Sequence, residues 1–174
     1  MSDRGLALAR EKMSAEGVAP AAIETFTRFY HLLESGETGL VREADVEPLT
    51  DLPRHADLDV SAEDAQAALA RTAIIKLNGG LGTSMGMDRA KSLLCARRGL
   101  SFLDIIARQV LHLREKYDVP LPLIFMNSFR TSSDTLAAVA RYQELPVDGL
   151  PLEFQQNKEP KLLVDDLAPV SYPK

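Results

Sequence analysis

The chain of 174 residues has no tryptophan, one cysteine and three histidines, and each scarcity removes a class of function. A single cysteine, Cys95, excludes an intrachain disulfide and a metal cluster built on several thiolates. We expect Cys95 to be a small buried side chain. The histidines do not have the spacing of metal ligands, so we expect structural or solvated roles for His31, His55 and His112. No metal site is expected within this chain.

Long apolar runs and an excess of positive charge are also missing. No uninterrupted apolar stretch approaches the roughly 18 residues that a membrane span requires, and the first residues carry charge where a signal peptide has its apolar core. The formal net charge of −5 argues against a general nucleic-acid-binding surface. We therefore expect a cytoplasmic protein without nucleic-acid or membrane partners. An acidic protein can still bind a polyphosphate where backbone amides and a few cations meet locally.

The N-terminal part of the sequence reads mainly as helices. Apolar spacing and helix-stop signals predict helices at 3–16 and 20–36. Residues 37–60 contain prolines and acidic residues and are expected to be a connecting segment. A capping-box pattern opens a short helix at 61–71. The sequence leaves open whether this N-terminal helical segment, residues 1–71, is a cap or a contact in a homo-oligomer.

From residue 72 onward, the pattern changes to strands alternating with helices. Short apolar runs predict strands, and capped amphipathic stretches predict helices, in the order strand 72–78, strand 92–96, helix 101–117, strand 122–127, helix 132–142 and strand 152–156. This alternation predicts a mostly parallel α/β sheet with right-handed crossovers. In such sheets, ligands bind beyond the carboxyl ends of the strands.

A loop with four glycines in eight positions follows the first of these strands. Residues 76–92 read Lys-Leu-Asn-Gly-Gly-Leu-Gly-Thr-Ser-Met-Gly-Met-Asp-Arg-Ala-Lys-Ser. Clustered glycines bring the backbone close to a ligand, and successive N–H groups in such a turn form an anion-binding concavity. Lys91 adds a positive charge that amides cannot supply. Together they predict a site that holds a triphosphate and stabilises the charge on a leaving pyrophosphate.

Three better-known loop patterns do not fit these residues. A P-loop requires a glycine before its Lys-Ser pair, and here Ala90 precedes Lys91. The dinucleotide pattern is Gly-x-Gly-x-x-Gly, and the glycine spacing in this chain is one residue longer. In addition, no helix is predicted at the third glycine. Residues 82–86 match the nucleophile elbow of α/β-hydrolases, but that enzyme needs a helix directly after Ser84 and then an acid and a histidine downstream. We interpret Ser84 as part of the phosphate loop, not as a nucleophile.

Residues 76–86 resemble the nucleotide-binding motif of the eukaryotic-type UTP–glucose-1-phosphate uridylyltransferase family. The resemblance continues through ordered blocks, which are Phe102-Leu-Asp104, Met126-Asn-Ser-Phe129, Asp134-Thr135 and Phe154-Gln-Gln156 followed by Pro160. The related UDP-N-acetylhexosamine pyrophosphorylases usually carry an arginine at the position of Ser84, which favours the glucose enzyme. The chain departs from the family pattern at residues 87–90, where the family commonly has Cys-x-Gly-Pro, and at Arg130, where it often has asparagine.

The resemblance implies a Rossmann-like nucleotide-diphospho-sugar transferase fold, GT-A-like and incomplete as a domain. Residues 1–71 would be its N-terminal helical segment, and residues 72–174 the first part of its nucleotide-binding catalytic domain. Lys91 would contact the nucleotide phosphates and act as the catalytic residue. Gln156 would hydrogen-bond uracil with the donor and acceptor of its carboxamide. The full set of implied nucleotide-binding residues is Leu77, Asn78, Gly79, Gly80, Gly82, Thr83, Lys91 and Gln156.

The implied reaction converts UTP and glucose 1-phosphate into UDP-glucose and pyrophosphate, with Mg²⁺ as a cofactor whose ligands lie mostly outside this chain. In the family, the sugar-phosphate residues and the metal-binding acid follow the blocks present here. We therefore expect a fragment of the enzyme that carries the nucleotide-binding part and shows no turnover alone. The alternatives are a pyrophosphorylase for UDP-N-acetylhexosamine or another UDP-sugar, and a nucleotide-binding fragment without catalysis.

Overall fold

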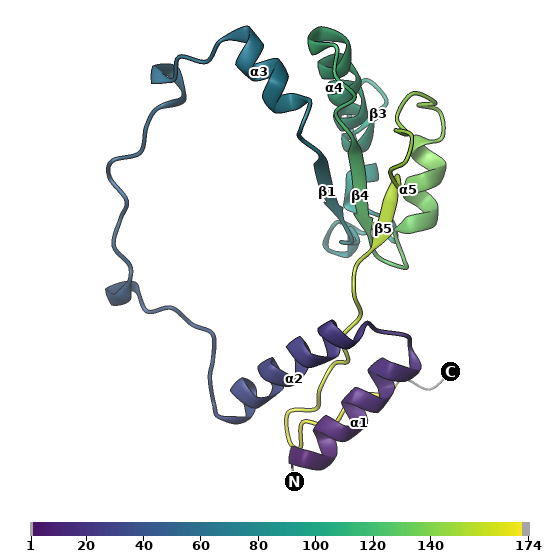
Figure 1. Ribbon diagram of the computed structural model, residues 1–174. Helices are drawn as coiled ribbons and strands as arrows, with labels where there is room; N and C mark the ends of the chain where they lie inside the picture. Colours follow the sequence, from purple (N-terminus) through teal and green to yellow (C-terminus); the bar gives the residue numbers. More distant parts are fainter. Residues whose placement is uncertain (1, 172–174) are drawn as a thin grey trace. The chain divides into compact units, whose positions relative to one another are not determined.

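The computed structural model describes residues 2–171 (Figure 1). The chain forms two compact units, residues 53–156 on the one hand and residues up to 52 together with those from 157 on the other. These units do not coincide with the boundary expected at residue 71, because the helix before that boundary belongs to the α/β unit. The division of the enzyme into domains 1–71 and 72–174 stays a prediction.

Two helices form the core of the first unit, and both were predicted from the sequence: α1 (Ser2–Ala15) and α2 (Pro20–Glu34). Pro20 lies in the first turn of α2, where its missing N–H leaves no bond unmade. The helices bury an apolar cluster of Ala9, Met13, Ile23, Phe26 and Tyr30. The later segment 157–171 returns to this cluster, since Leu162 and Leu167 pack against it. The Tyr30 hydroxyl donates a hydrogen bond to the Leu167 carbonyl oxygen at 3.2 Å.

Residues 37–60 form the expected connecting segment. All of their side chains are exposed, and their regular structure consists of two single 3₁₀ turns, Glu43–Asp45 and His55–Asp57. The segment carries several exposed apolar side chains, among them Leu40, Val41 and Leu49. It has little structure of its own because its prolines and acidic residues give neither a helical nor a strand pattern.

A parallel three-stranded sheet in the order β1-β4-β5 lies at the centre of the second unit (Figure 1). Its strands are β1 (Ile74–Asn78), β4 (Leu123–Asn127) and β5 (Glu153–Gln155). In the register of the sheet, Asn127 pairs with Asn78 on one side and with Gln155 on the other. The carboxyl ends of all three strands therefore lie level. The predicted parallel α/β arrangement is confirmed.

Helices α4 (Phe102–Tyr117) and α5 (Ser132–Val139) pack against this sheet in one apolar cluster. Leu103 of α4, Phe125 of β4 and Val139 of α5 are its buried members from each element. A shorter helix, α3 (Ala62–Leu69), precedes β1, and the Ser61 hydroxyl caps it by accepting a hydrogen bond from the Asp64 amide. Among the helices of residues 2–171, none combines the length and apolar character needed to cross a membrane.

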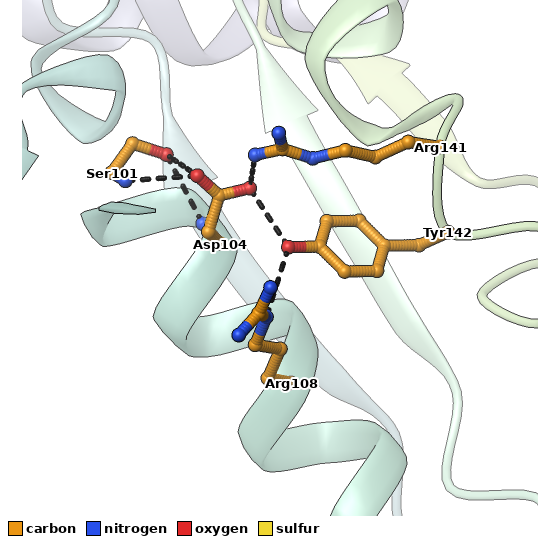
Figure 2. A network of polar contacts seen from close by, with 5 residues as sticks. All are labelled: Ser101, Asp104, Arg108, Arg141 and Tyr142. Carbon is orange, nitrogen blue, oxygen red and sulfur yellow. Dashed lines mark hydrogen bonds and ion pairs between the residues drawn. The ribbon is translucent and has the colours of Figure 1, made fainter. Parts of the chain in front are cut away.

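A buried carboxylate, Asp104, fixes the start of α4 (Figure 2). Its Oδ2 accepts hydrogen bonds from the Ser101 amide and hydroxyl, both at 2.8 Å, and the Ser101 hydroxyl accepts from the Asp104 amide. Oδ1 accepts from the Tyr142 hydroxyl at 2.9 Å and from the Arg141 guanidinium. Residues 141 and 142 had been expected to continue α5; the helix ends earlier, and their side chains instead reach back to Asp104 (Figure 2).

The stretch after the glycine loop differs from its prediction. Residues 91–93 form a 3₁₀ turn, and the strand begins later, at Cys95, as β2 (Cys95–Arg97). It pairs antiparallel with β3 (Leu100–Ser101) in a separate two-stranded hairpin. The expectation that Cys95 is buried is wrong, because this hairpin lies outside the main sheet and leaves the Cys95 side chain exposed.

Candidate functional site

The glycine loop begins at Asn78, the last residue of β1, and its own main chain closes its base. The Gly82 amide donates a hydrogen bond to the Arg89 carbonyl oxygen at 2.9 Å, and the Lys91 amide donates to the Gly80 carbonyl oxygen at 3.2 Å. These two bonds flank a bridge between the arms of the loop. The loop is thus a closed ring at the carboxyl edge of the sheet, and its base is independent of any ligand.

The tip of the loop is a 3₁₀ turn, Thr83–Met85, ended by Gly86 at φ 70°, a left-handed conformation that favours glycine. The Met87 amide then donates to the Gly82 carbonyl oxygen at 3.0 Å. A β-carbon at Gly82 would lie 2.8 Å from that of Met87, so only glycine fits there. No α-helix begins directly after Ser84. This agrees with the interpretation that the loop is not the nucleophile elbow of a hydrolase, which needs a helix at that point.

Other amides of the loop make no hydrogen bond to any residue between 2 and 171. They are the amides of Gly79, Gly80, Leu81, Thr83 and Ser84. The ammonium group of Lys91 likewise has no hydrogen-bond or ion-pair partner in that range, and its side chain is exposed. A ring of donors and one cation therefore stay available to an anion. Gly82 uses its amide and its carbonyl oxygen within the loop, so its predicted role is limited to letting a ligand approach, whereas the Lys91 amide is used but its ammonium group is not.

The Gln156 side chain reaches across the sheet edge to Gly79. A β-carbon built on Gly79 would overlap the Gln156 carboxamide oxygen and lie 2.8 Å from its Cδ. The main-chain amide of Gln156 donates a hydrogen bond to the Asn127 carbonyl oxygen at 2.8 Å. The structure thus brings together two residues that the resemblance assigned to nucleotide binding, and a side chain at position 79 would have to displace the Gln156 carboxamide.

An open depression of about 540 Å³ lies beside the loop tip, lined by Leu81, Thr83, Gly86, Met87, Asp88 and Arg130. Arg130 follows β4 and contributes a second cation beside the loop, which the sequence pattern did not single out as a site residue. Asp88 is the one carboxylate among these lining residues. No three histidine, cysteine, aspartate or glutamate side chains come together as a metal site anywhere in residues 2–171. The residues at the loop do not fit a magnesium site, and we derive no step through a metal ion.

A largely buried set of hydrogen bonds lies beneath the loop and joins the last residues of β1 and β4 to the first residue of β5. The Ser92 hydroxyl donates to Asn78 Oδ1 at 2.5 Å, and Asn78 Nδ2 donates to Asn127 Oδ1 at 2.8 Å. Asn127 Nδ2 donates to Glu153 Oε2 at 2.6 Å. Glu153 also accepts from the Ser132 hydroxyl at 2.8 Å. We call these four residues, Ser92, Asn78, Asn127 and Glu153, the strand-end network.

The strand-end network changes the interpretation of Asn78. Its side chain is only 4% exposed and is fully occupied, since Nδ2 also donates to the Thr135 hydroxyl at 2.8 Å. The predicted nucleotide contact of Asn78 is thereby limited to its main chain. Leu77, by contrast, is exposed beside the loop. The other network members were missed because polar residues at strand ends become a set only once the register of the sheet is known.

Proteins that bind phosphorylated nucleotides at the carboxyl edge of a parallel sheet use this combination of amides and a cation. The chain is an α/β protein with this combination of groups at the carboxyl edge of its sheet. Within it, the family model for UTP–glucose-1-phosphate uridylyltransferase matches residues 23–174, and the chain belongs to this family.

Individual relatives support the family assignment. The UTP–glucose-1-phosphate uridylyltransferase of Encephalitozoon cuniculi is 34% identical over 153 residues, which cover 87% of this chain and 30% of the relative. The potato enzyme is 39% identical over 66% of this chain and 24% of its own length. A Leishmania major UDP-glucose pyrophosphorylase mutant, solved with UDP-glucose, superposes with a TM-score of 0.87 at 36% identity, over 97% of this chain and 35% of that structure. The chain spans about a third or less of these proteins.

Proposed function

We propose that this chain is the nucleotide-binding part of an enzyme that forms UDP-glucose and pyrophosphate from UTP and glucose 1-phosphate. The observation that carries the proposal is the pairing of two ends of one site. Unpaired amides of the loop and Lys91 form a phosphate-binding end, and Gln156, packed on Gly79, forms a base-binding end. The family membership and the related structure solved with UDP-glucose support the choice of UTP and UDP-glucose.

In the proposed reaction, an oxygen of glucose 1-phosphate attacks the α-phosphorus of UTP. The bond from that phosphorus to the bridging oxygen breaks, and pyrophosphate leaves with the electron pair. Lys91 and the amides of Thr83 and Ser84 stabilise the negative charge on the phosphates as it moves to the leaving group. Gln156 fixes the base, which orients the reacting phosphate. Mg²⁺ and the sugar would be held by residues outside this chain.

The test is calorimetric titration of the 174-residue chain with UTP, UDP-glucose and ATP. We expect UTP and UDP-glucose to bind and ATP to bind at least about tenfold more weakly, because Gln156 offers a donor and an acceptor that match uracil. Lys91→Ala should weaken UTP about tenfold and uridine hardly at all, since it removes a charge-assisted contact to phosphate. Gln156→Ala should abolish the preference over ATP.

Equal affinity for UTP and ATP in the wild-type chain, or no binding of UTP, would contradict the proposal. We also expect no UDP-glucose formation by this chain alone, because the sugar and metal ligands are outside it. Formation of UDP-glucose by purified residues 1–174 would show that sugar- and metal-binding residues are present in this chain.

A further inference from the structure

The strand-end network is directional. Starting from Ser92, each member donates to the next: the hydroxyl to Asn78, the Asn78 amide group to Asn127, and the Asn127 amide group to Glu153. A carboxylate, which only accepts, ends the series. Amide groups that could point either way are thereby fixed in one orientation, because reversing either one would place two donors or two acceptors against each other.

Two members of the network, Ser92 and Asn127, lie beside the two ends of the proposed nucleotide site. Ser92 directly follows Lys91 in a 3₁₀ turn, and the Lys91 amide is itself bonded to Gly80. Asn127, in the middle, holds the Gln156 amide with its carbonyl oxygen. A shift of Ser92 therefore moves the backbone that carries the lysine, and a shift of Asn127 moves the backbone that carries the glutamine.

Burial gives the network its stiffness. Asn127 is fully buried, Asn78 is 4% exposed and Ser92 is 7% exposed. Hydrogen bonds in such a low-dielectric setting are stronger, and consecutive bonds polarise one another. Within residues 2–171, no buried side-chain nitrogen or oxygen lacks a partner, so the network has no unmade bond that would favour an alternative arrangement.

We propose that the strand-end network is a positioning device that sets the distance between Lys91 and Gln156, and with it the spacing at which the phosphates and the base of a nucleotide are held. Ser92 and Glu153 are then positioning residues that touch no substrate. This inference rests on the proposed function for its ligand. It extends the site from the loop to three strands of the sheet.

The binding test uses Ser92→Ala, which removes the first donor and leaves Lys91 in place. We expect UTP affinity to fall about tenfold, the effect of one lost buried hydrogen bond. In the Lys91→Ala background, Ser92→Ala should cause no further loss, because Ser92 acts through Lys91. Tyr142→Phe is the matched control: it removes a hydroxyl that donates to Asp104 and accepts from Arg108, in the same unit but outside the strand-end network, and should leave UTP affinity unchanged.

Unchanged UTP affinity in Ser92→Ala would overturn the inference, as would an equal loss with and without Lys91. If Ser92→Ala does not fold, Glu153→Gln and Glu153→Ala test the far end of the network. Gln keeps the size and one acceptor oxygen, so the Ala variant should lose clearly more affinity. Equal affinity in both variants also contradicts the proposal.

A second measurement separates this inference from the proposed function, because it needs no nucleotide. In Ser92→Ala, hydrogen exchange at the Lys91 amide should accelerate about tenfold, and Tyr142→Phe should leave it unchanged. If wild type fails to bind UTP but this exchange accelerates, the proposed ligand is wrong and the positioning role stands. Unchanged exchange at Lys91 contradicts the positioning role itself.

Discussion

At the scale of single residues, Gly79 and Gln156 show how closely the segment after β1 packs against the segment after β5. Gly79 has no positive φ, so its backbone alone does not require glycine. The carboxamide of Gln156 occupies the volume where a side chain would lie. Gly79 is needed for a close approach of two chain segments, a role distinct from the turn-forming role of Gly86.

We predict that Gly79→Ala weakens UTP binding about tenfold and removes the preference for UTP over ATP, because the new methyl group displaces the Gln156 carboxamide. The loss should not add to that of Gln156→Ala in a double variant. Titration calorimetry of the three variants measures this.

Gly80→Ala is the control for this prediction, since a β-carbon there meets nothing within 4 Å and φ is not positive. It should keep the preference for UTP over ATP, whatever its effect on the affinity for UTP, because the Gln156 carboxamide stays in place. Loss of that preference in Gly80→Ala would contradict the role assigned to the Gln156 contact.

The parts of the site differ in how far the sequence could predict them. Glycine spacing and a following lysine identify the loop, because those residue types have few other uses directly after a buried strand. Gln156 could be named only through the family resemblance. Ser92, Asn127 and Glu153 could not be named at all, since the sequence does not give the register that places strand ends side by side.

At the scale of elements, local signals predict most helices well. The Ser101–Asp104 capping box starts α4 where expected, because both hydrogen bonds are local. The end of α5 was predicted too late, because Arg141 and Tyr142 leave the helix to bind a carboxylate far away in sequence. Tertiary contacts override helix propensity at such ends.

The contact between α2 and segment 157–171 leads to a pH-dependent prediction. Burial raises the pKa of Tyr30 above its usual 10.0, and the negative charges of Glu34, Asp166 and Asp3 raise it further. A raised pKa favours the neutral phenol in the folded state. Its contribution to stability is therefore complete below about pH 10 and is lost as the pH rises through the folded-state pKa.

We consider the unit that contains α1, α2 and residues 157–171. We expect its free energy of unfolding to fall above about pH 10 in wild type and to fall less in Tyr30→Phe. At neutral pH, Tyr30→Phe should cost about 1 kcal/mol, because the hydrogen bond to the Leu167 carbonyl is lost. Urea unfolding followed by circular dichroism, at several pH values from about 7 to about 11, measures both effects. Identical pH profiles for the two proteins would contradict the assignment.

At the scale of the whole molecule, the connecting segment 37–60 and the return of residues 157–171 define the two units. The first was predictable from composition. The second was not, because Leu162 and Leu167 are ordinary apolar residues whose partners, on α1 and α2, lie far away in sequence. Long-range pairing of this kind leaves no periodic signal in the sequence.

We predict that trypsin cuts first at Arg42 and Arg54, which lie in the exposed connecting segment. Arg114 in α4 should resist, because its guanidinium donates hydrogen bonds to the carbonyl oxygens of Leu121, Glu144 and Leu145. Brief digestion followed by mass spectrometry identifies the first fragments. A first cut within α4 would show that the α/β unit is less stable than its packing indicates.

The position of Gln156 also has a consequence for biosynthesis. The glycine loop is translated early, but its proposed base-binding partner directly follows β5, the last strand of the three-stranded sheet. Since ribosomes add about 5–20 residues per second, several seconds separate the release of Gly79 from that of Gln156. If the proposed function holds, the nascent chain presents the phosphate-binding loop before it has the residue that distinguishes one base from another.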